Sequence, residues 1–201
     1  MVTSTRDRIL EAAAELFYEQ GFGATAVATI LRQAGVNSGS LYHLFPGKEA
    51  LLVEVLKWYQ GRLAPDVMDP VEAVESDPLE RIFVLLAWYR VNLEKTGCRL
   101  GCPIGNLALE LSDTHPEVRP DVERNFDLWT ARIESWLGAA SDRLPASTNR
   151  RALARFVLTV MEGGVMQARA ANDLTPFDDS VGELRSYIDA LLESAFQKEK
   201  S

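Results

Sequence analysis

Apolar residues recur at helical spacing along most of the chain. The first stripe, at positions 9, 13, 16 and 17, follows the i, i+4, i+7, i+8 rule of an amphipathic helix, and glycines at 21 and 23 end it. A longer stripe runs from Val118 to Leu137, and no segment shows the two-residue alternation of a strand. The pattern therefore predicts an all-α protein. Further helices are expected over residues 27–34, 37–45, 48–59, 79–96, 103–111, 153–164 and 181–196, with a connector over 61–76. The helix over 153–164 is expected to start near Ser147 or Thr148, and the cluster Asp178-Asp179-Ser180 is expected to cap the last helix.

The strongest helix start lies after this connector. Asp77 can cap, Pro78 suits a first helical position, and Glu80 stands where the carboxylate of a capping box reaches back. The helix that follows is apolar on most sides, which is typical of a helix buried between others. The chain thus divides into a small N-terminal bundle of short helices and a larger bundle.

The composition is that of a folded chain without a membrane span. With 47% hydrophobic residues among 201, the chain can bury enough surface to offset its conformational entropy. No apolar run reaches the roughly 18 residues of a membrane helix, and charges interrupt the apolar residues of the N-terminus. We therefore expect neither a span nor a signal peptide, and a cytoplasmic location.

The net charge of −8 argues at first against nucleic-acid binding, because phosphate contacts need Lys and Arg. The charge is uneven, however. Residues 1–60 hold five basic and six acidic residues, whereas the remainder holds 16 basic and 23 acidic. The acidity therefore belongs to the second part of the chain, and the first part can still carry a local basic patch.

The informative stretch is residues 25–48, TAVATILRQAGVNSGSLYHLFPGK. A helix, a turn at Gly35 and a short second helix have the proportions of a helix-turn-helix, whose second helix enters the major groove of DNA. Thr25 is expected to cap the first of these helices, and Asn37 the second. The small residues after Asn37 allow the backbone to approach base edges closely. Tyr42 and Lys48 can reach phosphates with a hydroxyl and a charge.

This stretch resembles the DNA-binding domain of tetracycline-repressor (TetR) family transcriptional regulators. The resemblance covers roughly residues 5–52, and the glycine, Leu-Tyr-x-x-Phe and Lys-Glu spacing is highly specific. Residues 97–137 look like the LmrA/YxaF-like branch of regulatory domains. The matching residues are Gly21-Phe22, Thr25, Ile30, Ala34-Gly35-Val36, Gly39-Ser40-Leu41-Tyr42-His43-Leu44-Phe45 and Lys48-Glu49-Ala50-Leu51.

The resemblance implies a set of DNA-binding residues. Positions matched by Thr25, Tyr42 and Lys48 hold phosphates in the family, and those matched by Ser38, Ser40 and His43 lie toward bases or neighbouring phosphates. Two departures weaken the match, since Ser38 replaces a frequent Lys, and Ala28-Thr29 replaces a common charged pair. Arg6, Arg8 and Arg32 are candidates to compensate. The implied set is Thr25, Ser38, Gly39, Ser40, Tyr42, His43 and Lys48.

The resemblance also implies a homodimer that responds to a small molecule. The last two apolar stripes would pair with those of a second copy, and the middle helices would enclose the effector. The implied dimer residues are Phe156, Val160, Gly164, Leu184, Ile188 and Leu191. The candidate pocket residues are Trp88, Tyr89, Asn106, Glu110, Phe126, Trp129, Met161 and Met166. Aromatic residues at helical spacing that fill a core, and an exposed face for Asn106 and Glu110, are the competing interpretations.

Several other interpretations stay open or find little support. His43 could be a half-buried packing residue instead of a DNA contact. Cys98 and Cys102 could form a redox switch, although two free thiols beside a loop are ordinary. The two histidines are far apart and no second cysteine pair exists, so no metal or other cofactor is expected. The sequence has no phosphate-binding GxxxxGK[ST] loop and no nucleophile elbow, so an enzyme is not expected.

The sequence thus predicts a helix-turn-helix domain over residues 1–52, its last helix continuing to about 60, and a ligand-binding and dimerisation domain over 61–201. We expect a dimeric repressor that leaves a palindromic operator in double-stranded DNA when a small apolar or aromatic molecule binds. The alternative is a helical ligand or thiol-redox sensor without sequence-specific DNA binding.

Overall fold

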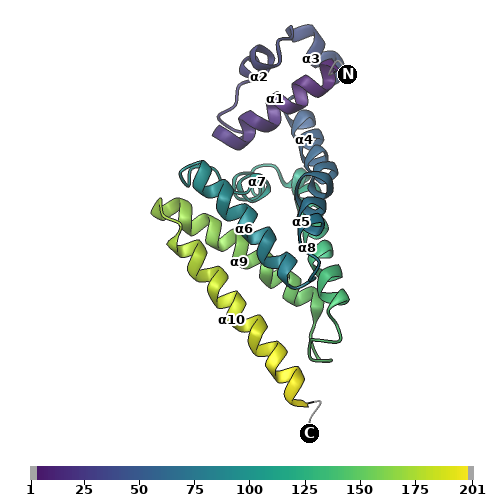
Figure 1. Ribbon diagram of the computed structural model, residues 1–201. Coiled ribbons are helices and arrows are strands. Elements are labelled where there is room, and N and C mark those ends of the chain that lie inside the picture. Colours follow the sequence, from purple (N-terminus) through teal and green to yellow (C-terminus); the bar gives the residue numbers. More distant parts are fainter. Residues whose placement is uncertain (1–3, 199–201) are drawn as a thin grey trace. The chain divides into compact units, whose positions relative to one another are not determined.

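The computed structural model describes residues 4–198, apart from the side chains of Ser40 and Lys198, and within this range it is built of helices without strands (Figure 1). The predicted all-α class is therefore confirmed. The helices are α1 (Thr5–Gln20), α2 (Val27–Ala34), α3 (Ser38–Leu44), α4 (Lys48–Leu63), α5 (Asp69–Val74), α6 (Glu80–Lys95), α7 (Pro103–Leu111), α8 (Arg119–Ala139), α9 (Arg150–Ala171) and α10 (Thr175–Lys198), with a π-helical turn at Ala64–Met68 and a 3-10 turn at Pro116–Val118.

The chain forms two compact units, and one segment from the middle of the sequence joins the N-terminal helices. The first unit contains residues 1–62 and 103–126, and the second contains residues 63–102 and 127–201. The sequence-based boundary near residue 60 assigns residues 103–126 to the second domain. In the structure these residues instead pack with the first unit, because α7 lies against α1 and the amide of Asn125 bonds the carbonyl of Leu56 at 3.2 Å.

The first unit is held by apolar side chains from α1 to α4. Ile9, Ile30, Leu41 and Leu51 are completely buried, and Phe17 is nearly so. Ser4 caps α1 by accepting a hydrogen bond from Asp7 N, and Asp7 reaches back to the Ser4 amide. This capping box satisfies two backbone donors at the start of the helix against which α2 and α3 pack.

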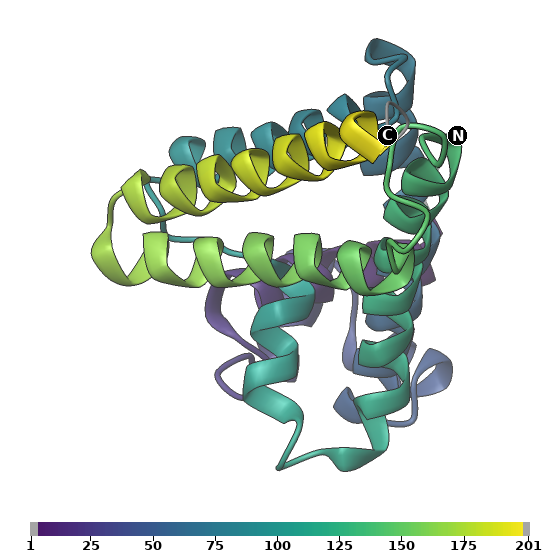
Figure 2. The same cartoon turned by 90° about the horizontal axis from the view of Figure 1, so that it is seen from below.

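The second unit is organised around two long antiparallel helices, α9 and α10, which lie side by side in both views (Figures 1 and 2). The core between them and α6 and α8 includes Leu86, Trp129, Ile133 and Met161. The N-cap of α6 is Leu79, without a side-chain cap bond, so the expected cap at Asp77 is displaced by two residues. Asp77 Oδ1 accepts from the amide of Leu79 at 2.8 Å. The expected capping box is not formed, because the Glu80 carboxylate pairs with Arg185 and the Asp77 amide donates to Glu75.

Three further expectations about local structure are wrong. The connector over 61–76 is helical to Val74, because Pro65 is accommodated at the start of a wide π-turn that runs into α5. Helix α9 is capped by Asn149, not started at 147 or 148. Helix α10 begins at Thr175, whose amide is bound by the Asp173 carboxylate, so the acidic cluster at 178–180 lies inside the helix and does not cap it.

A candidate DNA-binding surface

Helices α2 and α3 form the predicted helix-turn-helix. Gly35 ends α2 in the left-handed conformation, with φ of 64°, and its amide bonds the carbonyls of Arg32 and Leu31. The Arg8 guanidinium donates to the last carbonyl of α2, that of Ala34, at 3.2 Å. Glycine adopts this left-handed conformation without the steric strain that a Cβ atom would cause. The geometry of the turn therefore explains why a glycine occupies position 35.

One face of α3 is buried and the other is open to solvent. Leu41 is fully buried and anchors the helix, whereas Tyr42 is 61% exposed. Ser38, Gly39 and His43 are also exposed. The exposure of His43 contradicts the interpretation of this residue as a half-buried packing histidine. The side chain of Ser40 lies outside the described part of the structure.

Thr25 is placed differently from expectation. Its side chain is buried, and its hydroxyl donates to the carbonyl of Gly21 at 2.6 Å, with a longer contact to that of Leu16. The N-cap of α2 is Ala26, which makes no side-chain cap bond, so the expected capping by Thr25 is wrong. The hydroxyl instead ties down the end of α1.

Lys48, at the start of α4, is anchored on Phe22. Its Nζ donates a hydrogen bond to the Phe22 carbonyl and lies 4.2 Å from the centre of the Phe22 ring. Partial burial lowers the pKa of Lys48, while the carboxylates of Glu49 and Glu110 act in the opposite direction. The ammonium group is thus held at a defined place beside the α1–α2 turn.

Glu110, expected as a polar group of the effector pocket, lies at this same turn. Its Oε2 accepts from the amide of Phe22 at 2.9 Å, and its Oε1 accepts from the amide of Gly23 at 2.6 Å. The Phe22 ring also packs edge-on against His115 and Phe17, each 5.2 Å away between ring centres. Sequence reasoning missed the hydrogen bonds of Glu110 to this turn because the bonded residues are nearly 90 positions apart.

The three arginines that were candidates for phosphate contacts differ in their engagement. Arg6 pairs with Glu54 and lies over the ring of Phe45. Arg8 holds the end of α2, as described above. Arg32, in the last turn of α2, is exposed and has no ion pair among residues 4–198. Of the three arginines, Arg32 is therefore the one whose guanidinium has the fewest interactions within the protomer.

The candidate pocket residues of the second unit divide between core and surface. Trp129 and Met161 are buried in the core, and the Trp129 indole donates to the Tyr89 hydroxyl at 3.2 Å. Trp88 packs edge-on against Tyr89 but is partly exposed, and Met166 is more than half exposed. The remaining candidates, Asn106, Glu110 and Phe126, belong to the first unit. A common role in effector binding stays a prediction.

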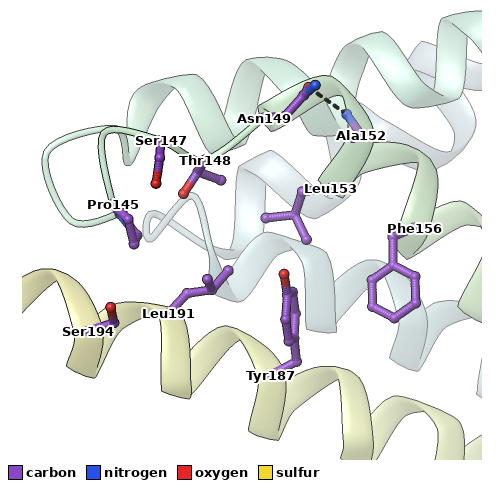
Figure 3. A pocket seen from close by; sticks show the side chains of 10 residues that line it. All are labelled: Pro145, Ser147, Thr148, Asn149, Ala152, Leu153, Phe156, Tyr187, Leu191 and Ser194. Carbon is purple, nitrogen blue, oxygen red and sulfur yellow. Dashed lines mark hydrogen bonds between the residues drawn. The ribbon is translucent and has the colours of Figure 1, made fainter.

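An open groove of about 440 Å³ lies between the start of α9 and the second half of α10 (Figure 3). Leu153, Tyr187 and Leu191 project into the space between the two helices, and Asn149 caps α9 by accepting from the amide of Ala152. Sequence reasoning assigned only two of its residues, Phe156 and Leu191, and assigned them to the dimer contact. The full lining is Pro145, Ser147, Thr148, Asn149, Ala152, Leu153, Phe156, Tyr187, Leu191 and Ser194.

The predicted dimer residues also divide into two groups. Gly164, Leu184 and Ile188 are buried within the protomer, where they pack α9 against α10. Phe156 is 44% exposed and lies edge-on to Tyr187 at 5.8 Å, and Val160 and Leu191 are partly exposed. The second group leaves an apolar surface on the outer side of the helix pair.

Both cysteines are free and buried. Cys98 has a left-handed backbone, with φ of 57°, and its amide bonds the Leu93 carbonyl at 2.8 Å beyond the end of α6. Cys102 hydrogen bonds to Glu162 of α9, and burial raises the pKa of this carboxyl group against that bond. No group of three or more metal-ligating side chains occurs over residues 4–198, and none of the helices there is long and apolar enough to cross a membrane.

A two-helix motif with an exposed second helix, in a chain that also forms a larger helical unit, is typical of a helix-turn-helix regulator. The sequence model described as bacterial regulatory proteins, tetR family, matches residues 9–55, and that of the LmrA/YxaF-like transcriptional regulator C-terminal domain matches residues 78–182. The chain belongs to the tetR family of transcriptional regulators. Its membership confirms the expectation that it is not an enzyme.

Individual proteins support this assignment over nearly the whole chain. The regulator LmrA of Bacillus subtilis (strain 168) is 31% identical over 86% of this chain and 90% of its own length. The repressor DhaR of Mycobacterium sp. (strain GP1) is 27% identical over 88% of each. The crystal structure of a TetR transcriptional regulator from Chloroflexus aurantiacus matches with a TM-score of 0.79 at 29% identity, covering 92% of this chain and 94% of that one.

Proposed function

We propose that this regulator is a cytoplasmic homodimer that represses transcription from a palindromic operator and leaves it when a small apolar or aromatic molecule binds. Residues 1–52, with the helix that continues to about 60, would bind DNA. Residues 61–201 would provide the effector pocket and the dimer contact, with 103–126 packed on the DNA-binding unit.

The observation that carries the proposal is the division of α3 into a buried and an open face. Leu41 fixes the helix in the unit, while Ser38, Gly39, Tyr42 and His43 are presented together on the side away from it. An exposed face of small and hydrogen-bonding residues fits a helix that enters the major groove. A mere packing element would bury its large aromatic residue instead.

Dimerisation would use the outer side of α9 and α10. Phe156, Val160, Tyr187 and Leu191 leave apolar area uncovered there, and a second copy would bury it. Two DNA-binding units held by such a contact can read half-sites about 34–36 Å apart. An effector that binds better to a different separation would release DNA by shifting the population of dimers.

The first experiment is a selection of purified protein on random DNA duplexes, followed by affinity measurements at several salt concentrations. Enrichment of an inverted repeat would support the proposal. Because few Lys and Arg side chains of the DNA-binding unit are free of partners within the protomer, we expect the affinity to depend only weakly on salt. The slope of log K against log salt concentration should be about 0.9 for each phosphate neutralised. Failure of a folded dimer to enrich any sequence at low salt would leave the ligand or thiol sensor as the better interpretation.

Two variants sharpen this experiment. Tyr42→Phe removes one exposed hydroxyl and should weaken operator binding roughly 10- to 150-fold per half-site if it bonds a phosphate, since hydrogen bonds to charged groups contribute about 1.5–3 kcal/mol. Lys95→Ala removes an exposed cation from α6 in the second unit and serves as the control. Equal affinities for Tyr42→Phe and the unmodified protein would exclude that contact.

The dimer contact can be tested by light scattering at micromolar concentration. Phe156→Glu places a charge on the exposed apolar surface and should yield monomers. Val74→Glu is the matched control, because Val74 is an exposed apolar residue of α5 in the same unit. If Phe156→Glu remains as dimeric as the control, the second copy binds elsewhere.

A further inference from the structure

The carboxylate of Glu110 bridges two consecutive backbone amides of the α1–α2 turn. One oxygen accepts from Phe22 N at 2.9 Å and the other from Gly23 N at 2.6 Å. These amides belong to no helix, so they have no partner in a regular backbone pattern. A side chain of α7, far along the sequence, therefore determines how this turn is held.

The glycines on either side of Phe22 make this close approach possible. A Cβ atom on Gly21 would lie 3.0 Å from Oε2 of Glu110, and a Cβ atom on Gly23 would lie 3.0 Å from Oε1. Either distance is tighter than ordinary van der Waals contact. The turn thus combines two amide donors outside any helix with the absence of side chains that would displace the carboxylate.

The same turn carries the anchor of Lys48. The Phe22 carbonyl accepts the hydrogen bond of the Lys48 ammonium, and the Phe22 ring lies beneath it at 4.2 Å. Glu110 and Lys48 therefore both hold Phe22, Glu110 through its amide and Lys48 through its carbonyl and its ring. A shift of Phe22 would move the position at which the ammonium group is held.

We propose that Glu110 is a positioning residue for DNA binding, which fixes the Phe22 turn so that Lys48 presents its ammonium group to a phosphate of the operator. The inference rests on the proposed function, because it assigns a role within operator binding. Glu110 itself touches no DNA in this arrangement. Its effect reaches the operator through Phe22 and Lys48.

A carboxylate near Lys48 also repels phosphate. The test must therefore separate the effect of the negative charge of Glu110 from the effect of its hydrogen bonds to the turn. Glu110→Asp keeps the charge but withdraws the carboxylate by about one carbon–carbon bond, roughly 1.5 Å, which breaks the bridge to the two amides. Glu123→Asp is the matched control, since Glu123 is exposed on α8 in the same unit. Operator affinity and its salt dependence are measured for both variants, alone and combined with Lys48→Ala.

The expected loss is bounded by the contact that Lys48 makes. A phosphate contact with a salt slope of about 0.9 changes affinity about eightfold between 1 M and 0.1 M salt. For each half-site, Glu110→Asp should therefore weaken binding by up to about eightfold at 0.1 M salt and make the slope shallower by up to about 0.9, which is up to about 1.8 for the dimer. In the Lys48→Ala background the same change should cost nothing further. Glu123→Asp should behave as the unmodified protein in both backgrounds.

Each other outcome overturns the inference in a recognisable way. An unchanged slope, or an equal loss with and without Lys48, would show that Glu110 acts on folding alone. If the unmodified protein binds no operator, the proposed function fails and the inference falls with it. If Glu110→Asp does not fold, amide hydrogen exchange of the unmodified protein decides, since the Phe22 and Gly23 amides should exchange slowly and fast exchange would refute the bridge.

Discussion

Replacing Gly164 by alanine tests whether this glycine packs α9 against α10 inside one protomer. A Cβ atom at this position would lie 3.0 Å from Cδ2 of Phe177 and 3.3 Å from its Cα. Phe177 is almost completely buried, so neither its ring nor its backbone has free space to yield. The substitution therefore adds a methyl group where the two helices leave no space for it.

Two opposing effects set the size of the change in stability. Alanine is better than glycine within a helix by about 1 kcal/mol. Overpacking of a filled core costs about 1–3 kcal/mol. Gly182→Ala is the control, because Gly182 is exposed within α10 and a Cβ atom there meets nothing within 4 Å. The control should gain about 1 kcal/mol, and Gly164→Ala should fall about 1–3 kcal/mol below it.

The assay is urea unfolding followed by circular dichroism at one fixed protein concentration, since the stability of a dimer depends on concentration. The reasoning would be refuted if Gly164→Ala were as stable as Gly182→Ala. A further comparison concerns the dimer. If Gly164 contacted a second copy instead of Phe177, its substitution would change the dimer dissociation constant and leave the unfolding of the monomer unaffected.

Three further predictions concern backbone strain, buried charge and the turn at Phe22. Gly35→Ala should destabilise the protein by about 1–2 kcal/mol in urea unfolding, because φ at this position is +64°, and an unchanged midpoint would contradict it. Burial raises the pKa of Glu162 above its ordinary 4.5, so the folded state binds more protons than the unfolded state and stability falls as pH rises from about 4.5 through the folded pKa. The stability of Glu162→Gln should not decrease with pH in this way, so its free energy of unfolding should rise relative to that of the unmodified protein between pH 4.5 and 7. Parallel pH profiles of the two proteins would show that Glu162 does not contribute to the pH dependence. Gly23→Ala should displace Glu110 and accelerate hydrogen exchange of the Phe22 amide, with wild-type exchange as the contrary result.

Local features of the sequence predicted much of the fold. The apolar spacing in α1 and the glycine at position 35 define a helix and a turn over a few residues, and the structure has both. Tyr42, which is expected from the sequence to reach a phosphate with its hydroxyl, is open to solvent in the structure. A helix or a turn of this kind depends on residues within one or two helical turns of each other, and the spacing of apolar residues carries information over that distance.

What the sequence did not indicate depends on contacts between distant residues or on the choice between equivalent caps. Glu110 is a candidate polar group for a pocket because its spacing from Asn106 is helical. Nothing in the sequence indicates that two amides nearly 90 residues earlier would be its partners. Gly164 is a candidate dimer residue, and the structure shows Phe177 of the same chain as its close neighbour. Periodicity identifies an apolar face without identifying what covers it.

Local charge, more than net charge, determines whether this acidic chain can approach DNA. The segment from Gln20 to Lys48, which contains α2 and α3, has no Asp or Glu and carries Arg32 and Lys48 as cations. Fields between exposed charges fade over about 10 Å at 0.1 M salt, so acidic residues beyond that distance weigh little on a phosphate at this surface. Glu49 and Glu110 are two carboxylates that lie close to Lys48. The two oxygens of Glu110 are bound by backbone amides that disperse its charge. The carboxylate that contacts the turn is thereby one whose repulsion of phosphate is reduced.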